Sequence, residues 1–90
     1  MINPNITTAL QAIARLPEWE FIPFTYPSGY VDDNTYRFHS ASDLLYDMRD
    51  KVKAIVQMIP TVSFDFEDDS WYCEEEEQEH TAYTMTITTQ

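Results

Sequence analysis

The sequence predicts an α+β domain in which two helices pack on one face of a single antiparallel sheet, in the order α-β-β-α-β-β-β. Three observations predict it: apolar residues recur at helical spacing in two segments, they alternate with polar residues in several others, and Pro and Gly separate these segments. At 90 residues the chain has room for one hydrophobic core, so residues 1–90 are expected to form one domain with four to five strands. Packing both helices on a single face buries the apolar stripes and leaves the other face in water.

Both helices are predicted from their ends and their apolar spacing. Asn3 followed by Pro4 is typical of a helix start, and Pro17 ends the segment. Ser40 with Asp43 approximates a capping box at the start of the second helix, which ends at Pro60. That helix carries one continuous apolar face, formed by Leu44, Leu45, Met48, Val52, Ile55, Val56 and Ile59.

Alternation of apolar and polar residues predicts the strands. Residues 18–26 suit an edge strand with a bulge, because Pro23 has no N–H to give to a ladder. Turns are expected at 27–29, 32–34 and 68–70, where Pro, Gly, Asn, Asp and Ser gather. Further strands are expected at 36–38, at 62–67, from Trp71 into the acidic run that follows, and at 83–88.

The charge of the chain is strongly negative and unevenly distributed. Sixteen Asp and Glu against five Lys and Arg give a formal net charge of −11. All five bases precede residue 54, whereas nine acids follow it, all between Asp65 and Glu79. A field of this sign repels nucleic acids and anionic membranes and attracts positively charged partners. Direct binding to nucleic acid or to a membrane is therefore not expected.

The sequence also bears on the compartment. Cys73 is the only cysteine, so no internal disulfide can form and the fold does not depend on an oxidising compartment. The first residues resemble no signal peptide, and no apolar run approaches the roughly 20 residues that cross a bilayer. We therefore expect a cytoplasmic protein.

Catalytic motifs are scarce, and we expect no enzyme. A single glycine excludes the usual Gly-rich phosphate loop, and neither G-x-S-x-G nor H-E-x-x-H occurs. Cys73 with His39 or His80 would form a nucleophilic pair only if a nearby positive charge stabilised the thiolate, and four glutamates follow Cys73 instead. A strand cysteine and two surface histidines are the favoured interpretation.

No cofactor or dedicated metal site is expected. The carboxylates of residues 65–69 are hard ligands that suit Ca²⁺ or Mg²⁺, so weak divalent binding is an open alternative. An EF-hand loop that started at Asp65 would need Gly at its sixth position, where the chain has Ser70. Zinc is disfavoured because one cysteine and two distant histidines do not make a ligand set.

The two tryptophans occupy different settings. Trp19 alternates with Glu18 and Glu20, which is typical of a core or interface aromatic, and the core is favoured. Trp71 lies between Asp69 and the run that starts at Glu74, where core and interface are equally favoured. An aromatic anchor inside a charged surface is a common hot spot of protein interfaces.

The acidic segment 65–79 is the candidate partner-binding surface. Alternate residues of a strand share one face at intervals of roughly 6.6 Å. Asp65 and Glu67 are expected to line one strand, and Glu74 with Glu76, or Glu75 with Glu77, the next. Two adjacent acidic rows would imitate a phosphate backbone for a partner whose Lys and Arg neutralise phosphates. The candidate contact residues are Asp65, Glu67, Asp68, Asp69, Trp71, Glu74, Glu75, Glu76, Glu77 and Glu79.

A passive interpretation of this segment stands beside the functional one. Runs of like charge are often solvated, and Glu74–Glu77 would then be only a hairpin tip. Against this, repulsion at −11 destabilises the compact state, and solubility needs far less charge.

In its size, its charge and this acidic segment, the chain resembles the small phage-encoded inhibitors that mimic DNA, which include anti-CRISPR, anti-restriction and uracil-glycosylase-inhibitor proteins. The resemblance involves no shared motif, so no functional residue is carried over from it. It implies an acidic binding protein in the host cytoplasm that occupies the basic groove of a nucleic-acid-binding protein, for example a CRISPR effector, a restriction enzyme or a repair enzyme.

Two other kinds of binding protein fit the same sequence. An immunity protein or antitoxin would use the same charges to cover a basic toxin site. A regulatory interaction module would instead bind through an aromatic surface, for which the candidate residues are Trp19, Phe24, Tyr26 and Tyr30.

Overall fold

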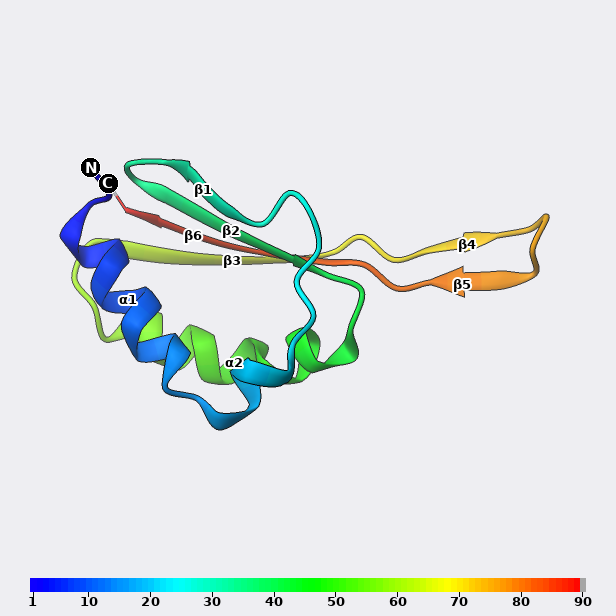
Figure 1. The fold of residues 1–90 in the computed structure, drawn as a ribbon, viewed down its shortest axis with the longest axis horizontal. Coiled ribbons are helices and arrows are strands. Elements are labelled where there is room, and N and C mark those ends of the chain that lie inside the picture. Colours follow the sequence, from blue (N-terminus) through cyan, green and yellow to red (C-terminus); the bar gives the residue numbers. More distant parts are fainter. Residues whose placement is uncertain (90) are drawn as a thin grey trace.

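The computed structural model describes residues 1–89 and confirms the predicted α+β class and the order α-β-β-α, after which four strands follow where three were expected (Figure 1). The elements in chain order are the helix α1 (Pro4–Ala14), the 3₁₀ helix η1 (Pro17–Phe21), β1 (Gly29–Asp32), β2 (Thr35–Ser40), α2 (Asp43–Gln57), β3 (Val62–Asp68), β4 (Trp71–Cys73), β5 (Gln78–His80) and β6 (Tyr83–Thr89). Four strands form an antiparallel sheet in the order β1-β2-β6-β3, and β4 with β5 forms a separate two-stranded ladder. Both α helices lie on one face of the larger sheet (Figure 1).

Helix α1 begins as predicted. Asn3 is its N-cap, because the Asn3 Oδ1 accepts a hydrogen bond of 2.9 Å from the backbone N–H of Asn5. Pro4 takes the first helical position, where an N–H would have no intrahelical partner. Ile6 and Ile13 are buried, so the apolar stripe of α1 packs into the core.

The edge strand predicted for residues 18–26 is wrong. Pro17–Phe21 form η1, and the extended residues that follow make only a single bridge, from Phe24 to Ser40. Pro17 favours the turn because its ring holds φ at a helical value at the first position. The turn directs Trp19 inward, where its ring lies 5.1 Å from that of Phe38 in an edge-on contact. Trp19 therefore packs against the core, although not from a strand.

The first sheet strand lies later, at Gly29–Asp32. Gly29 enters β1 with φ of +120°, a backbone conformation that residues with a Cβ rarely adopt. The predicted turn before β2 is confirmed at Asp33 and Asn34, and it joins β1 to β2. The sequence pattern missed β1 because three of its four residues are exposed and no apolar alternation marks it.

Helix α2 has the predicted apolar face but a different N-cap. Ser42 caps it, because the Ser42 Oγ accepts a hydrogen bond of 3.2 Å from the backbone N–H of Leu44. Ser40 is instead the last residue of β2, and its buried hydroxyl donates to the carbonyl oxygen of Pro23 at 2.8 Å. The face that α2 turns to the sheet buries Leu45, Met48, Val52 and Val56.

The strand β6 forms the centre of the sheet and of the core. Met85 faces Phe38 on β2 and Phe66 on β3, and it is fully buried. Ile87, two residues later on the same face of β6, is also fully buried between β2 and β3. Successive residues of a strand alternate between faces, so Thr84, Thr86 and Thr88 lie on the face opposite the helices. We call that face the open face.

The strands β4 and β5 extend the β3–β6 pair beyond the body of the molecule (Figure 1). Asp68 faces Tyr83 at the end of one ladder, and three residues further along each strand Trp71 faces His80, so both ladders share one register. We call residues 71–80 the arm. The molecule measures 45 × 26 × 18 Å, and the arm accounts for one end of its longest dimension (Figure 1).

Candidate acidic interaction surface

Three carboxylates form a single row along the open face. Asp65 lies opposite Thr86 and Glu67 lies opposite Thr84 across the β3–β6 ladder. Asp69 continues the line, because its Oδ2 accepts a hydrogen bond of 2.8 Å from the Thr84 hydroxyl. Alternate positions of a strand are separated by roughly 6.6 Å. We call Asp65, Glu67 and Asp69 the acid row.

The second acidic row predicted beside this one is absent from the described residues. The neighbouring strand β6 presents threonines, and the strand beyond it, β2, presents Arg37 and His39. These groups line a shallow hollow of about 350 Å³ on the open face, formed by Arg37, His39, Asp65, Glu67, Asp69, Thr84 and Thr86. The open face is therefore acidic along β3 and basic along β2.

One buried hydroxyl group connects the acid row to β2 through hydrogen bonds. Thr84 has a single hydroxyl proton, which it donates to Asp69. The 2.9 Å contact between the Thr84 Oγ1 and the His39 Nδ1 therefore requires the ring nitrogen to be the donor. The His39 Nε2 is buried and has no hydrogen-bond partner among the described residues. This chain of hydrogen bonds positions the carboxylate of Asp69.

Asp68 does not join the acid row. Its Oδ1 accepts a hydrogen bond of 3.0 Å from the backbone N–H of Ser70, and the contacts with Ser70 hold the pKa of Asp68 below its ordinary value. By strand alternation it also lies on the face opposite to Asp65 and Glu67. Asp68 shapes the junction between β3 and the arm.

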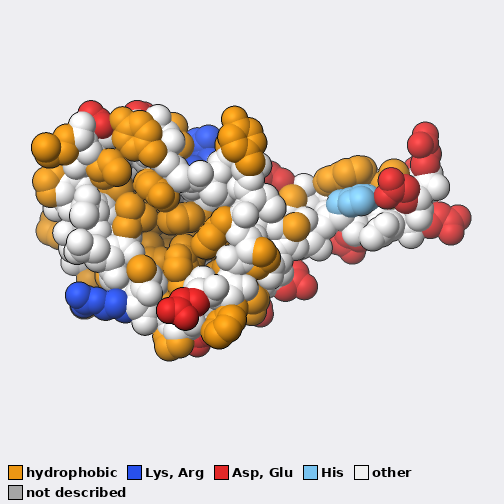
Figure 2. Space-filling view, in the orientation of Figure 1, with side chains coloured by type: hydrophobic (Ala, Val, Ile, Leu, Met, Phe, Trp, Pro, Cys, Tyr) orange, Lys and Arg blue, Asp and Glu red, His pale blue; other side chains and the backbone are white. Residues whose placement is uncertain are grey.

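The four consecutive glutamates do not line a strand, which corrects the prediction for them. Glu74–Glu77 form the turn between β4 and β5, and Glu77 has a positive φ of 49°. Glu79 lies opposite Tyr72 on β4, and all five glutamates of the arm are exposed. Figure 2 shows acidic side chains at the far end of the arm.

The aromatic residues of the arm are outside the core. Trp71 is 55% exposed, and its ring stacks on that of His80 with centroids 4.4 Å apart and planes 16° apart. The His80 Nε2 lies 3.0 Å from a carboxylate oxygen of Glu76, which returns from the turn. Tyr72 is 59% exposed and, by strand alternation, belongs to the other face of the arm. Trp71 is therefore not a core residue, and its role at an interface stays a prediction.

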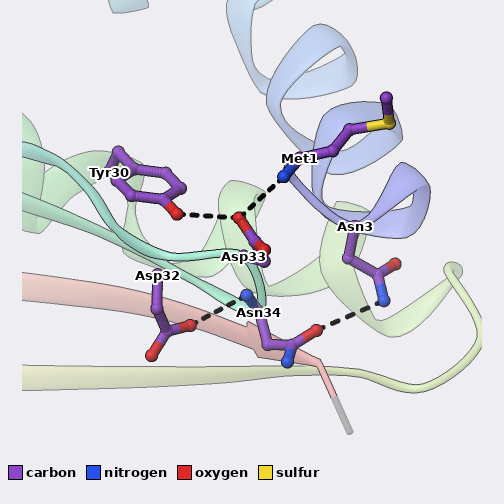
Figure 3. A network of polar contacts seen from close by, with 6 residues as sticks. All are labelled: Met1, Asn3, Tyr30, Asp32, Asp33 and Asn34. Atoms are coloured by element: carbon purple, nitrogen blue, oxygen red, sulfur yellow. Dashed lines mark hydrogen bonds and ion pairs between the residues drawn. The ribbon is translucent and has the colours of Figure 1, made fainter.

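The acids at the opposite end of the molecule have structural partners (Figure 3). Asp33 accepts hydrogen bonds from the Tyr30 hydroxyl at 2.7 Å and from the N-terminal ammonium group of Met1 at 3.1 Å. Both contacts hold the pKa of Asp33 below its ordinary value. Asp32 accepts from the backbone N–H of Asn34 at 2.8 Å. These contacts secure the β1–β2 turn and the start of α1, so Asp32 and Asp33 serve the fold.

The residues considered for a metal or nucleophilic site take different places in the fold. No three His, Cys, Asp or Glu side chains among residues 1–89 are grouped so that they could hold a metal ion. Cys73 lies opposite Gln78 in the arm, next to the Trp71–His80 pair. His39, the other histidine considered with Cys73, lies on the open face of the sheet and contacts Thr84.

Sequence reasoning missed the residues that position side chains in the acid row and in the arm. Thr84 and His39 act on Asp69, and His80 acts on Trp71 and Glu76. Alternation in the stretch 83–87 was the available signal for Thr84, since it places every second residue on the open face. No local signal marks His39, whose partner Thr84 comes from another strand, whereas His80 lies only four residues after its partner Glu76.

In comparisons with known proteins, no family model, curated protein or solved structure matches the chain. Among residues 1–89, no helix has both the length and the apolar character needed to cross a membrane.

Proposed function

We propose that this protein is an acidic inhibitor that binds a nucleic-acid-binding protein and occupies its basic groove. The observation that carries the proposal is the arm. It extends beyond the body of the molecule (Figure 1), and its ten residues include five exposed glutamates and no Lys or Arg. An isolated two-stranded ribbon gains little stability in water, and clustered like charge weakens it further. Binding to a positively charged partner would offset both effects.

The distribution of charge supports a partner whose surface is basic. The acid row and the arm belong to one two-stranded ribbon, which consists of the β3–β6 pair and the arm that continues it. No Lys or Arg occurs in the sequence after Lys53. Such a one-signed field accelerates the approach of a cationic surface and disfavours nucleic acid itself. Release of the counterions that accompany the carboxylates would make the affinity depend on salt, as it does for phosphates.

The connection of the ribbon to the core supports binding without large rearrangement. Strand β6 is buried at Met85 and Ile87, and the same ribbon carries the acid row on its open face. Asp69 is also held by Thr84. Side chains that are positioned before binding lose less conformational entropy when the complex forms.

Affinity capture tests the proposal. The tagged protein would be incubated with a nuclease-treated bacterial lysate, and captured proteins would be eluted along a salt gradient and identified by mass spectrometry. We expect nucleic-acid-binding proteins that elute at moderate salt and are released at constant salt by added nucleic acid. A partner that added nucleic acid does not release would contradict the proposal.

Two charge variants of equal net charge sharpen the test. In the arm variant, Glu74, Glu75 and Glu79 are replaced by Gln, which leaves the Glu76–His80 contact in place. The control variant carries Glu20→Gln, Asp47→Asn and Asp50→Asn, three exposed acids of the body. We expect the arm variant to lose capture and the control to retain it. Equal capture by both would exclude the arm as the contact. Loss on Tyr26→Ser alone would favour the aromatic-surface alternative.

A further inference from the structure

This inference rests on the proposed function and concerns the kind of groove that the ribbon would occupy. A protein that imitates duplex DNA must present two lines of negative charge, because a duplex has two phosphate backbones. Here the open face carries a single line, from Asp65 through Glu67 to Asp69, and the exposed glutamates of the turn, Glu74–Glu77, lie further along the ribbon. The next strand that could carry a second line is β2, and it presents Arg37 and His39 instead.

The positive charge of Arg37 on β2 opposes a duplex-binding surface directly. Residues of β2 lie two strands away from the acid row, which is roughly 10 Å at the usual strand spacing. A partner that contacts both backbones of a duplex would bring its second set of Lys and Arg towards Arg37. Like charges brought together across an interface cost affinity.

The aromatic side chains of the arm also fit a single strand better than a duplex. Trp71 and Tyr72 are both more than half exposed, and they lie on opposite faces of the arm. The bases of a duplex are stacked inside, so duplex-binding grooves meet mainly phosphates and base edges. Channels for single strands combine a basic groove with aromatic side chains on which unstacked bases lie. Exposed aromatic rings beside carboxylates match such a channel in both respects.

We propose that the acid row and the arm imitate a single nucleic-acid strand, and that the partner's groove is a single-strand channel that is lined with basic and aromatic side chains. In this complex the carboxylates take the places of phosphates and the Trp71 and Tyr72 rings take the places of bases. The backbones of the two strands in the ribbon lie about 5 Å apart. The carboxylates would contact the basic side chains of the channel, and the exposed rings would stack on its aromatic side chains.

Competitive release from the immobilised protein tests this inference. Proteins captured from the nuclease-treated lysate would be released at constant salt with oligothymidine or with a DNA duplex of equal phosphate content. We expect oligothymidine to release them at a concentration about tenfold lower, because only unpaired bases can stack in the channel. Release by the duplex at an equal or lower concentration would overturn the inference and leave the proposed function standing. Failure of both competitors would overturn both.

Aromatic substitutions provide an independent readout. Trp71→Ser and Tyr72→Ser should each weaken capture by about tenfold, as the loss of one stacked base does, whereas Trp71→Phe should retain most of it. Tyr26→Ser is the matched control, because Tyr26 is an aromatic residue of the body that is 96% exposed. The Tyr72 variant leaves the Trp71–His80 stack intact, so it tests the inference even where Trp71→Ser unfolds the arm. Unchanged capture by the Tyr72 variant would contradict the inference.

Discussion

At the scale of single residues, hydroxyl groups of β6 link the sheet to its surroundings on both faces. Thr84 connects His39 to Asp69 on the open face. Its neighbour Tyr83 lies on the helix face, where the hydroxyl donates to the Oδ1 of Asp43 at 2.9 Å. Asp43 is the first residue of α2, so this bond ties the start of the helix to the central strand. The sequence alone shows only a Tyr next to a Thr in a strand.

The Tyr83–Asp43 bond predicts an unusual tyrosine titration. The hydrogen bond to the carboxylate raises the pKa of Tyr83 to about 12 from an ordinary value of 10.0. A raised pKa in the folded state means that the stabilisation is complete below pH 10 and is lost as the pH rises through 12. In an alkaline titration of phenolate absorbance, we expect a late step that Tyr83→Phe removes.

Tyr30→Phe is the control for that titration. The Tyr30 hydroxyl donates to Asp33, which also raises the pKa of Tyr30. Removing the Tyr30 hydroxyl should leave the titration step near pH 12 in place, because that step belongs to Tyr83. A late step that persists in the Tyr83→Phe protein would contradict the assignment.

At the scale of elements, α2 shows how hydrogen bonds determine the residue at which a helix begins. A capping box read from Ser40 and Asp43 placed the start of α2 two residues early. The Ser40 side chain is engaged by the carbonyl of Pro23, so it is not free to cap, and Ser42 supplies the cap instead. Asp43 then becomes the first helical residue, where its negative charge complements the helix dipole.

The cap assignment predicts a measurable loss of stability. Ser42→Ala should lower the free energy of unfolding by about 1 kcal/mol, because the N–H of Leu44 loses its partner. Ser42→Asp should retain most of the stability, since Asp is an equally good cap. Urea denaturation would measure both. Ser63→Ala, an exposed position on β3, is the control and should change little. A Ser42→Ala protein as stable as the parent would contradict the assignment.

The arm is expected to be dispensable for the fold. None of its residues belongs to the core, and Ser70 and Thr81 face each other at its base if the shared register is continued. Replacing Trp71–His80 by Asn-Gly would close this pair with a two-residue turn. We expect the free energy of unfolding to change by less than about 1 kcal/mol, because no core contact is lost. Urea denaturation measures this, and capture of partners should be abolished. Global unfolding of the shortened protein would contradict the expectation.

At the scale of the whole molecule, the charge is divided between the fold and the surface. Some acids of the body make contacts that hold the fold together, such as Glu18 with Lys51 at 3.1 Å and Asp33 with the N-terminus. The ribbon instead leaves Asp65, Glu67 and the glutamates of the arm exposed. Repulsion among unpaired charges of one sign opposes compaction, so part of the folding free energy offsets this repulsion.

Salt should therefore stabilise this protein. Screening shortens the range of repulsion from about 30 Å at 0.01 M to about 3 Å at 1 M ionic strength. We expect the urea midpoint to rise between low and high NaCl concentrations. The rise should be smaller for the variant with Glu74, Glu75 and Glu79 replaced by Gln. A midpoint that falls with added NaCl would show that the attractive ion pairs outweigh the repulsion.

The sequence by itself determined the α+β class, the helix α1 with its Asn3 cap, the apolar face of α2 and the alternation of β3 and β6. These features follow from periodicity and from short-range capping, which depend on neighbours along the chain. For the same reason the sequence located the acidic segment and showed that no base accompanies it.

Only the tertiary structure decided how that segment is arranged. The first part of the segment predicted as a strand at residues 18–26 instead belongs to η1, where Trp19 packs against Phe38, a residue distant in sequence. The acid row became single because β6 and β2, rather than another acidic strand, lie beside β3. Glu74–Glu77 became a turn because Trp71 pairs with His80 across the ribbon. Strand pairing and side-chain packing join residues far apart in sequence, and no local pattern specifies them.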